Sequence, residues 1–130
     1  MGVNEGLYSR LSGYAGLTAL VNKRIYPMIL PQDCKMPAVT FQRISGPRIH
    51  AMGNDMPLVH PRYQVSAISD DYDQARSVAD QIISALKNER DATWGSLTVQ
   101  ASYVEDDQDF YEDDTRRFRI PVDVIIWAEE

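Results

Sequence analysis

Apolar and polar residues alternate along the chain with the periods of amphipathic helices and half-buried strands. The clearest helical pattern places six apolar residues at positions i, i+3, i+4, i+7, i+8 and i+11 of one helix face: Ala75, Val78, Ala79, Ile82, Ile83 and Leu86. Asp71, with Gln74 three residues later, supplies an N-terminal capping signal, and Lys87 and Asn88 suit a C-terminal end. The pattern therefore predicts a long helix between Asp71 and Asn88.

Two shorter helices are predicted near the N-terminus. Apolar residues share one helix face over 3–11 and again over 15–21, and Ser12-Gly13 separates the two segments. Arg24 to Tyr26 is predicted to be extended, because Pro27 disfavours helical backbone in the residue before it. We therefore expect a helix pair followed by a short extended piece.

Strands are predicted where apolar and polar residues alternate with a period of two, over 38–45, 62–69, 95–104 and 115–127. The last of these shows the cleanest alternation, with five apolar residues on one face: Phe118, Ile120, Val122, Val124 and Ile126. Because an acidic segment joins the last two strands, we expect them to form a long antiparallel hairpin.

The order of the predicted elements indicates an α+β fold in a single domain over residues 1–130. We expect an antiparallel β-sheet of about four strands with helices packed on one face and long, mobile hairpin loops. One such loop is residues 48–60, where Gly53-Asn54-Asp55 and Pro57 form a turn cluster.

Composition fits one cytosolic domain. The chain has 130 residues, 44% of them hydrophobic, which is enough to bury a core without disulfides. Its single cysteine, Cys34, excludes an intramolecular disulfide and suits a reducing compartment. Met1 to Arg10 does not resemble a secretory signal, and no apolar stretch approaches the roughly 20 residues of a membrane span. We expect the protein to be made in a cytoplasm and to have no membrane partner.

Charge is concentrated in one segment. Of the 19 acidic residues, seven lie within residues 105–114: Glu105, Asp106, Asp107, Asp109, Glu112, Asp113 and Asp114. The rest of the chain is close to neutral, with 12 acids against 13 bases. A protein that grips nucleic-acid phosphates needs a basic face, so tight DNA binding is disfavoured, whereas passing contact with repelled DNA is compatible.

The acidic segment has three interpretations. It can be a solvated loop, a calcium site or a repulsive surface. It departs from the EF-hand pattern, because Tyr111 stands where a third ligand belongs and no glycine follows. We therefore favour a solvated or repulsive segment over a calcium site.

Candidate chemistry is sparse. The chain has no glycine-rich phosphate loop, nucleophile elbow, zinc-protease motif or Cys-x-x-Cys pair. Cys34 has no sequence-local histidine to activate it, and His50 and His60, ten residues apart, offer only two ligands for a metal. We expect no catalytic residues, no metal and no cofactor.

Two apolar sets are predicted to make subunit contacts. The first is the loop set Ile49, Met52, Met56 and Leu58. Methionines adapt to irregular partner surfaces, so we favour docking on a neighbouring subunit over folding back onto the core. The second is Ile125 and Trp127, on the opposite face of the last strand from its core residues. That pair is either a subunit contact or is covered by a helix or the N-terminal segment.

Several segments, in order, resemble phage tail-completion (tail-to-head joining) proteins. They are Leu17-Thr18-Ala19-Leu20-Val21, Arg24-Ile25-Tyr26-Pro27, and residues 37–45, 62–66 and 71–80. The resemblance implies a structural virion subunit, assembled in a bacterial host cytoplasm, that forms a ring, expected to be a hexamer, at the head-proximal end of a tail. Its implied partners are further copies of itself, a tail-tube protein and a head-connector protein.

The resemblance also implies an antiparallel sheet with flanking helices and brings no catalytic residues. Within such a ring, we expect the acidic segment to face the channel, where like charge would keep passing DNA from sticking. The competing hypotheses are a cytosolic adaptor or regulatory module and a small bacterial enzyme with an unrecognised site.

Overall fold

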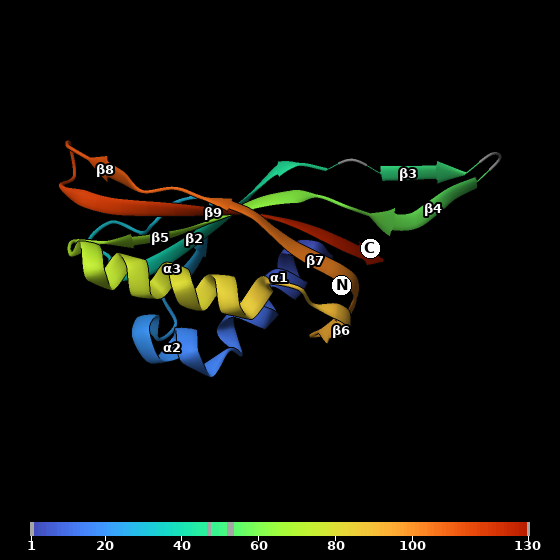
Figure 1. Ribbon diagram of the computed structural model, residues 1–130, viewed down its shortest axis with the longest axis horizontal. Helices are drawn as coiled ribbons and strands as arrows, with labels where there is room; N and C mark the ends of the chain where they lie inside the picture. The colour runs from blue at the N-terminus through green and yellow to red at the C-terminus, as the bar shows by residue number, and fades with distance from the viewer. Residues whose placement is uncertain (1, 47, 52–53, 130) are drawn as a thin grey trace.

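Three helices cover one face of a β-sheet (Figure 1). The computed structural model describes residues 2–46, 48–51 and 54–129, and for 48–51 and 54–58 the backbone alone. The helices are α1 (Val3–Ser12), α2 (Ala15–Val21) and α3 (Tyr72–Leu86), which confirms the three predicted helices. No helix in these ranges is long and apolar enough to cross a membrane.

The N-terminus of α3 is capped as the sequence predicts. The Asp71 carboxylate accepts a hydrogen bond from the Gln74 backbone N–H at 3.2 Å. The Gln74 side chain does not close the usual capping box, because its Oε1 accepts instead from the Ser69 hydroxyl at 2.7 Å. Ser69 Oγ in turn accepts from the Asp71 N–H, so three side chains fix the turn from strand to helix.

The sheet of the described chain joins nine strands. They are β1 (Ile25–Pro27), β2 (Ala38–Ser45), β3 (Arg48–Ala51), β4 (Asn54–Val59), β5 (Arg62–Ser69), β6 (Arg90–Trp94), β7 (Leu97–Asp107), β8 (Phe110–Glu112) and β9 (Arg117–Glu129). Strand β9 is central. It pairs with β5 and the end of β4 along one edge, and with β7 and β8 along the other. Beyond these, β2 and β1 continue from β5, and β6 pairs with β7.

The predicted number of strands, about four, was too low. The sheet is also mixed and not antiparallel throughout, because β1 runs parallel to β2. The four predicted strands are present as β2, β5, β7 and β9. The other five have three to six residues each. Segments this short show little alternation of their own, and their backbone groups become strands by pairing with longer neighbours.

The core lies between the sheet and the helices. The predicted inward face of β9 is confirmed from Ile120 to Ile126, where every second side chain is fully buried. Gly6 lets α1 approach the sheet, because a Cβ added there would lie 2.9 Å from the Cβ of Leu97. Strand β9 contributes five buried apolar residues to this core, and β4 pairs with one of its ends and β8 with the other.

Candidate functional site

A β-hairpin, here called the arm, extends from one end of the sheet. It consists of β3 and β4, with Arg48 opposite Val59 and His50 opposite Asp55. In the described part of the arm, the strand pairing with the body is that of Leu58 and Val59 with the end of β9. The rest of the arm projects beyond the helices, at the right of Figure 1. Residues 48–60 were predicted to be a mobile loop, and most of them instead form paired strands.

The predicted contact residues of this region lie on or beside the arm. Ile49 belongs to β3, and Met56 and Leu58 belong to β4, but their side chains lie outside the described part of the chain. Met52 lies outside the described residues altogether. The arm's backbone runs away from the helices rather than back over them (Figure 1). Docking of these four side chains on a neighbouring subunit stays a prediction.

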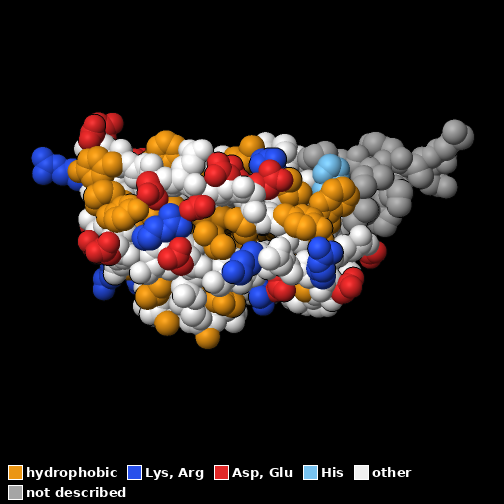
Figure 2. Space-filling view, viewed as in Figure 1, with side chains coloured by type: hydrophobic (Ala, Val, Ile, Leu, Met, Phe, Trp, Pro, Cys, Tyr) orange, Lys and Arg blue, Asp and Glu red, His pale blue; other side chains and the backbone are white. Residues whose placement is uncertain are grey.

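Aromatic side chains gather at the base of the arm, on the face of β9 that turns away from α3. His60 stacks on Trp127, with ring centroids 4.3 Å apart and planes 13° from parallel. Tyr103 lies opposite Ile125 in the β7–β9 register and is 38% exposed. We call these four residues the base patch. Figure 2 shows hydrophobic side chains beside the histidine at this end of the molecule.

No helix of the described chain covers the base patch, since all three pack on the other face (Figure 1). Ile125 and Trp127 are nevertheless half-buried, and His60 covers one side of the indole ring. The patch lies beside the base of the arm, because Leu58 and Val59 pair with the end of β9. Subunit contact through Ile125 and Trp127 remains a prediction.

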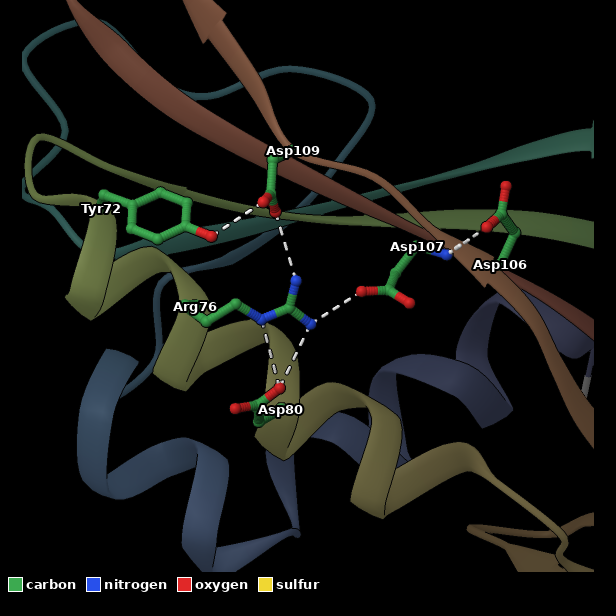
Figure 3. A network of polar contacts seen from close by, with 6 residues as sticks. All are labelled: Tyr72, Arg76, Asp80, Asp106, Asp107 and Asp109. Atoms are coloured by element: carbon green, nitrogen blue, oxygen red, sulfur yellow. Dashed lines mark hydrogen bonds and ion pairs between the residues drawn. The ribbon is translucent and has the colours of Figure 1, made fainter.

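The acidic segment is tied to α3 by Arg76 (Figure 3). The guanidinium lies 2.7 Å from Asp107 Oδ2, and 3.2 Å from both Asp109 Oδ1 and Asp80 Oδ1. Burial lowers the pKa of Arg76, but hydrogen bonds to Asp107 and Asp80 outweigh it, so the pKa lies above its ordinary value. The Tyr72 hydroxyl donates to Asp109 Oδ2 at 2.7 Å, and this hydrogen bond raises the pKa of the phenol.

Two further arginines reach the segment from the sheet. Arg62 lies 3.3 Å from Glu105, and Arg119 lies 3.6 Å from Glu112. Four of the seven predicted acids are therefore paired with arginine. The other three, Asp106, Asp113 and Asp114, make no ion pair within the described residues.

The acidic segment is also more ordered than the predicted loop. Strand β7 continues to Asp107, and β8 follows after two residues. No group of three or more metal-ligating side chains occurs among the described residues. Arg76 was not singled out from the sequence, because Asp107 and Asp109 lie 31 and 33 positions away and only folding brings them to it.

A second apolar region lies at the other end of the sheet. A groove of about 260 Å³, here called the far-end groove, is lined by Met28, Ile29, Leu30, Ile68, Glu112, Thr115, Arg117 and Arg119. Met28 is 59% exposed and Ile29 78% exposed, and Phe110, paired with Arg119, is 50% exposed. Sequence reasoning missed this region. The available signal was three consecutive apolar residues between Pro27 and Pro31, where no strand or helix can bury them.

Cys34 is half-buried in the loop before β2. Its thiol donates to the Lys35 carbonyl at 3.3 Å. A hydrogen bond with this thiol raises the pKa of Tyr26. These are local contacts within a loop, and they supply no histidine to activate the sulfur.

Comparisons with known proteins agree with the resemblance seen in the sequence. The family described as Tail completion protein gp17 matches residues 5–129. Among solved structures, a chain of the "Virion of native gene transfer agent (GTA) particle" superposes with a TM-score of 0.78. It is 16% identical, and the similarity covers 95% of this chain and 92% of that one, which shows a shared fold. Sequence comparison with curated proteins matches none of them.

The family match leaves out only four residues at the start and one at the end. The fold similarity covers nearly the same length. The chain is thus a structural component of a phage-type virion tail, and it belongs to the Tail completion protein gp17 family.

Proposed function

We propose that the protein forms a ring at the head-proximal end of a phage or prophage tail. There it ends the tail tube, joins the tube to the head connector, or does both, acting through its surface and not through catalysis. The observation that carries the proposal is the family match over residues 5–129. Its partners are further copies of itself, the tail-tube protein and the head-connector protein.

The position of the arm favours assembly into a ring. A ring closes through heterologous contacts, in which one surface of a subunit meets a different surface of its neighbour. The arm and the base patch lie side by side, because β4 pairs with the end of β9 near Trp127. We therefore assign the arm and the base patch, which includes Ile125, to one half of the contact between subunits. We expect the other half elsewhere on the molecule. A hexamer is the ring size that the family resemblance implies.

The acidic segment is proposed to face the ring's channel. Like charge on a channel wall lowers the affinity of passing DNA. Asp106, Asp113 and Asp114 make no ion pair within the described residues, and the other four acids share three arginines, so the segment keeps a net negative charge. An electron microscopy map of the assembled ring tests the placement directly. Finding residues 105–114 on the outer rim would end this part of the proposal.

Purified protein mixed with tail tubes tests the main proposal. Electron microscopy should show a ring on one end of each tube, and tube elongation should stop when the protein is added. Bare tube ends with continued elongation would contradict the proposal.

Replacing Trp127 with glutamate tests the base patch separately, by light scattering. Trp127 is half-buried at the surface, so the variant should fold but put a charge into the contact and stay monomeric by light scattering. Tyr8→Glu is the matched control, because Tyr8 is 42% exposed on α1, away from β9. Equal assembly of Trp127→Glu and the parent would show that the base patch is not a subunit contact.

A further inference from the structure

We propose that the stack of His60 on Trp127 is a joint that fixes the direction in which the arm leaves the body. His60 is the residue directly after β4, and Trp127 lies near the end of β9. His60 is thus a positioning residue for the arm. The inference concerns the free subunit, so it can fail without the proposed ring failing.

A joint is needed because the strand pairing at the root of the arm is short. Among the described residues, β4 pairs with β9 at two positions, Leu58 with Glu129 and Val59 with Ala128. Two-stranded ribbons twist more than wider sheets, and an isolated hairpin is only marginally stable. Backbone pairing over two residues therefore does not fix the direction of the arm unless side chains hold its root.

The root of the arm is held from both faces of the sheet. Val59 is 1% exposed and belongs to the core under the helices. Trp127 lies between the buried Ile126 and Ala128 in β9, so its ring points to the outer face. His60 stacks on that ring and therefore lies on the outer face as well. Rotation of the chain about its own axis would have to pull Val59 out of the core and break the stack.

The geometry of the two rings suits a fixed contact. Their centroids are 4.3 Å apart and their planes lie 13° from parallel. Because the carbon atoms of stacked rings touch at about 3.5 Å, this centroid distance means that the rings are offset sideways. Offset stacking is a favoured arrangement, and it stabilises a pair beyond the area that the rings bury.

The two residues after His60 are also bound to the body. The Ile126 backbone N–H donates a hydrogen bond to the Pro61 carbonyl at 3.1 Å. The Arg62 guanidinium lies 3.3 Å from Glu105. The chain on the β5 side of His60 is therefore fixed, and the stack sets how β4 departs from it.

The length of the arm makes a small change at the joint large at the far end of β4. Five strand steps of about 3.3 Å separate Asn54 from Val59, which gives roughly 16 Å. Over that length, a tilt of about 20° at the root displaces Asn54 by roughly 5 Å. A surface whose direction is fixed in advance costs less conformational entropy to bind. The joint thus orients the arm before any partner arrives.

The distance between two spin labels on the free subunit tests the joint. The labels are attached to Asn54→Cys on β4 and to Ser84→Cys, which is exposed on α3, in a Cys34→Ser chain with no other cysteine. Pulsed electron paramagnetic resonance should give a narrow distance distribution. Adding His60→Ala should make the distribution roughly twice as wide, because the hairpin alone does not hold its direction. An equally narrow distribution with His60→Ala overturns the inference, and so does a wide one before that change.

His60→Phe is the matched control. Phenylalanine keeps a flat ring over the Trp127 indole and removes the ring nitrogens, so the narrow distribution should be retained. If His60→Phe widens the distribution as much as His60→Ala does, stacking is not what holds the arm, and the inference is wrong.

The NMR signals of the indole N–H groups give a second, independent readout. The chain has two tryptophans, Trp94 and Trp127. His60→Ala should shift the Trp127 signal, because the ring current of the imidazole is lost. The Trp94 signal should stay in place, since Trp94 is 2% exposed in the core, and this also shows that the variant is folded. An unmoved Trp127 signal would mean that the rings do not stack in solution, which ends the inference and leaves the proposed ring untouched.

Discussion

Two hairpins extend from opposite ends of β9, and they are held in different ways. The acidic one, residues 105–119, contacts the body through side chains, with Arg76 on α3 bound to Asp107 and Asp109. The arm joins the body through the pairing of Leu58 and Val59 with β9 and through the Val59 side chain, which is buried in the core. The same sheet therefore carries one extension folded onto its own helix and another that projects from the body.

This difference suggests that the acidic hairpin stabilises its own subunit and that the arm contacts other subunits. Ordering a segment costs conformational entropy, which contacts must offset. The acidic hairpin offsets this cost within the subunit through its arginine pairs. The arm has an apolar sequence and its backbone projects away from the helices (Figure 1), so we infer that contacts in an assembly offset its cost. This view predicts that changes to the arm act on assembly and changes to the acidic hairpin act on stability.

Shortening the arm should have the largest effect. Replacing Ile49 to Leu58 with Asn-Gly leaves Arg48 and Val59 joined by a two-residue turn suited to a hairpin. We expect ring assembly to disappear entirely, because the projecting half of the contact is gone. The melting temperature of the monomer should change by no more than about 2 °C, since the change removes one of the two described β4–β9 pairs, Leu58 with Glu129, and keeps the buried Val59.

Light scattering and differential scanning calorimetry measure these two outcomes. If the melting temperature falls by much more than this and the shortened protein still assembles, the role assigned to the arm is wrong. The arm would then stabilise its own subunit, and the contact between subunits would lie elsewhere.

Removing the Arg76 guanidinium should lower the stability of the folded subunit, and we expect this effect to be smaller than the effect of shortening the arm on assembly. Arg76→Ala leaves Asp80, Asp107 and Asp109 without their shared cation. The carboxylates are partly solvated, so we expect a loss of about 1 kcal/mol, larger than for one isolated surface pair. For a domain of this size that corresponds to a fall in melting temperature of roughly 3–5 °C.

Arg117→Ala is the matched control. Arg117 makes one ion pair within the described chain, 3.6 Å from Asp70, whose side chain is 71% exposed. Thermal unfolding of that variant should differ little from the parent. Equal destabilisation of the two variants would show that the Arg76 network does no more than an ordinary surface pair.

The sequence predicted the elements whose own residues show a long apolar periodicity or a local capping signal. Helix α3 and strand β9 have long apolar periodicities, and the Asp71 cap is a local signal, so all three could be identified without a structure. Short strands such as β3 and β8 could not, because they exist by pairing with distant segments. The four predicted strands therefore became nine in the described chain.

The candidate surfaces were predictable to a similar degree. The apolar loop and the Ile125–Trp127 pair stand out in the sequence, but their adjacency depends on β4 pairing with β9. The pairing of the acidic segment with arginines was missed, because Arg76 precedes Asp107 by 31 positions. Ile29 was missed because an exposed isoleucine in a loop looks like any apolar residue until its burial is known.

The smallest expected effect concerns the Tyr72 phenol at the edge of the acidic hairpin. Its hydrogen bond to Asp109 raises the pKa of Tyr72 above the ordinary value of 10.0. A raised pKa means that the folded protein favours the neutral phenol. The contribution of this hydrogen bond is therefore fully present below about pH 10 and is lost as pH rises through the folded-state pKa.

Asp109→Asn removes the carboxylate that causes the shift, so the pKa of Tyr72 should fall toward 10.0. An NMR titration of ¹³C-labelled tyrosine measures it directly. Asp113→Asn is the control, because Asp113 makes no ion pair or hydrogen bond with Tyr72 in the described chain. If the Asp109→Asn titration matches the parent, the acidic hairpin is not held against α3 in solution, and the contrast between the two hairpins weakens accordingly.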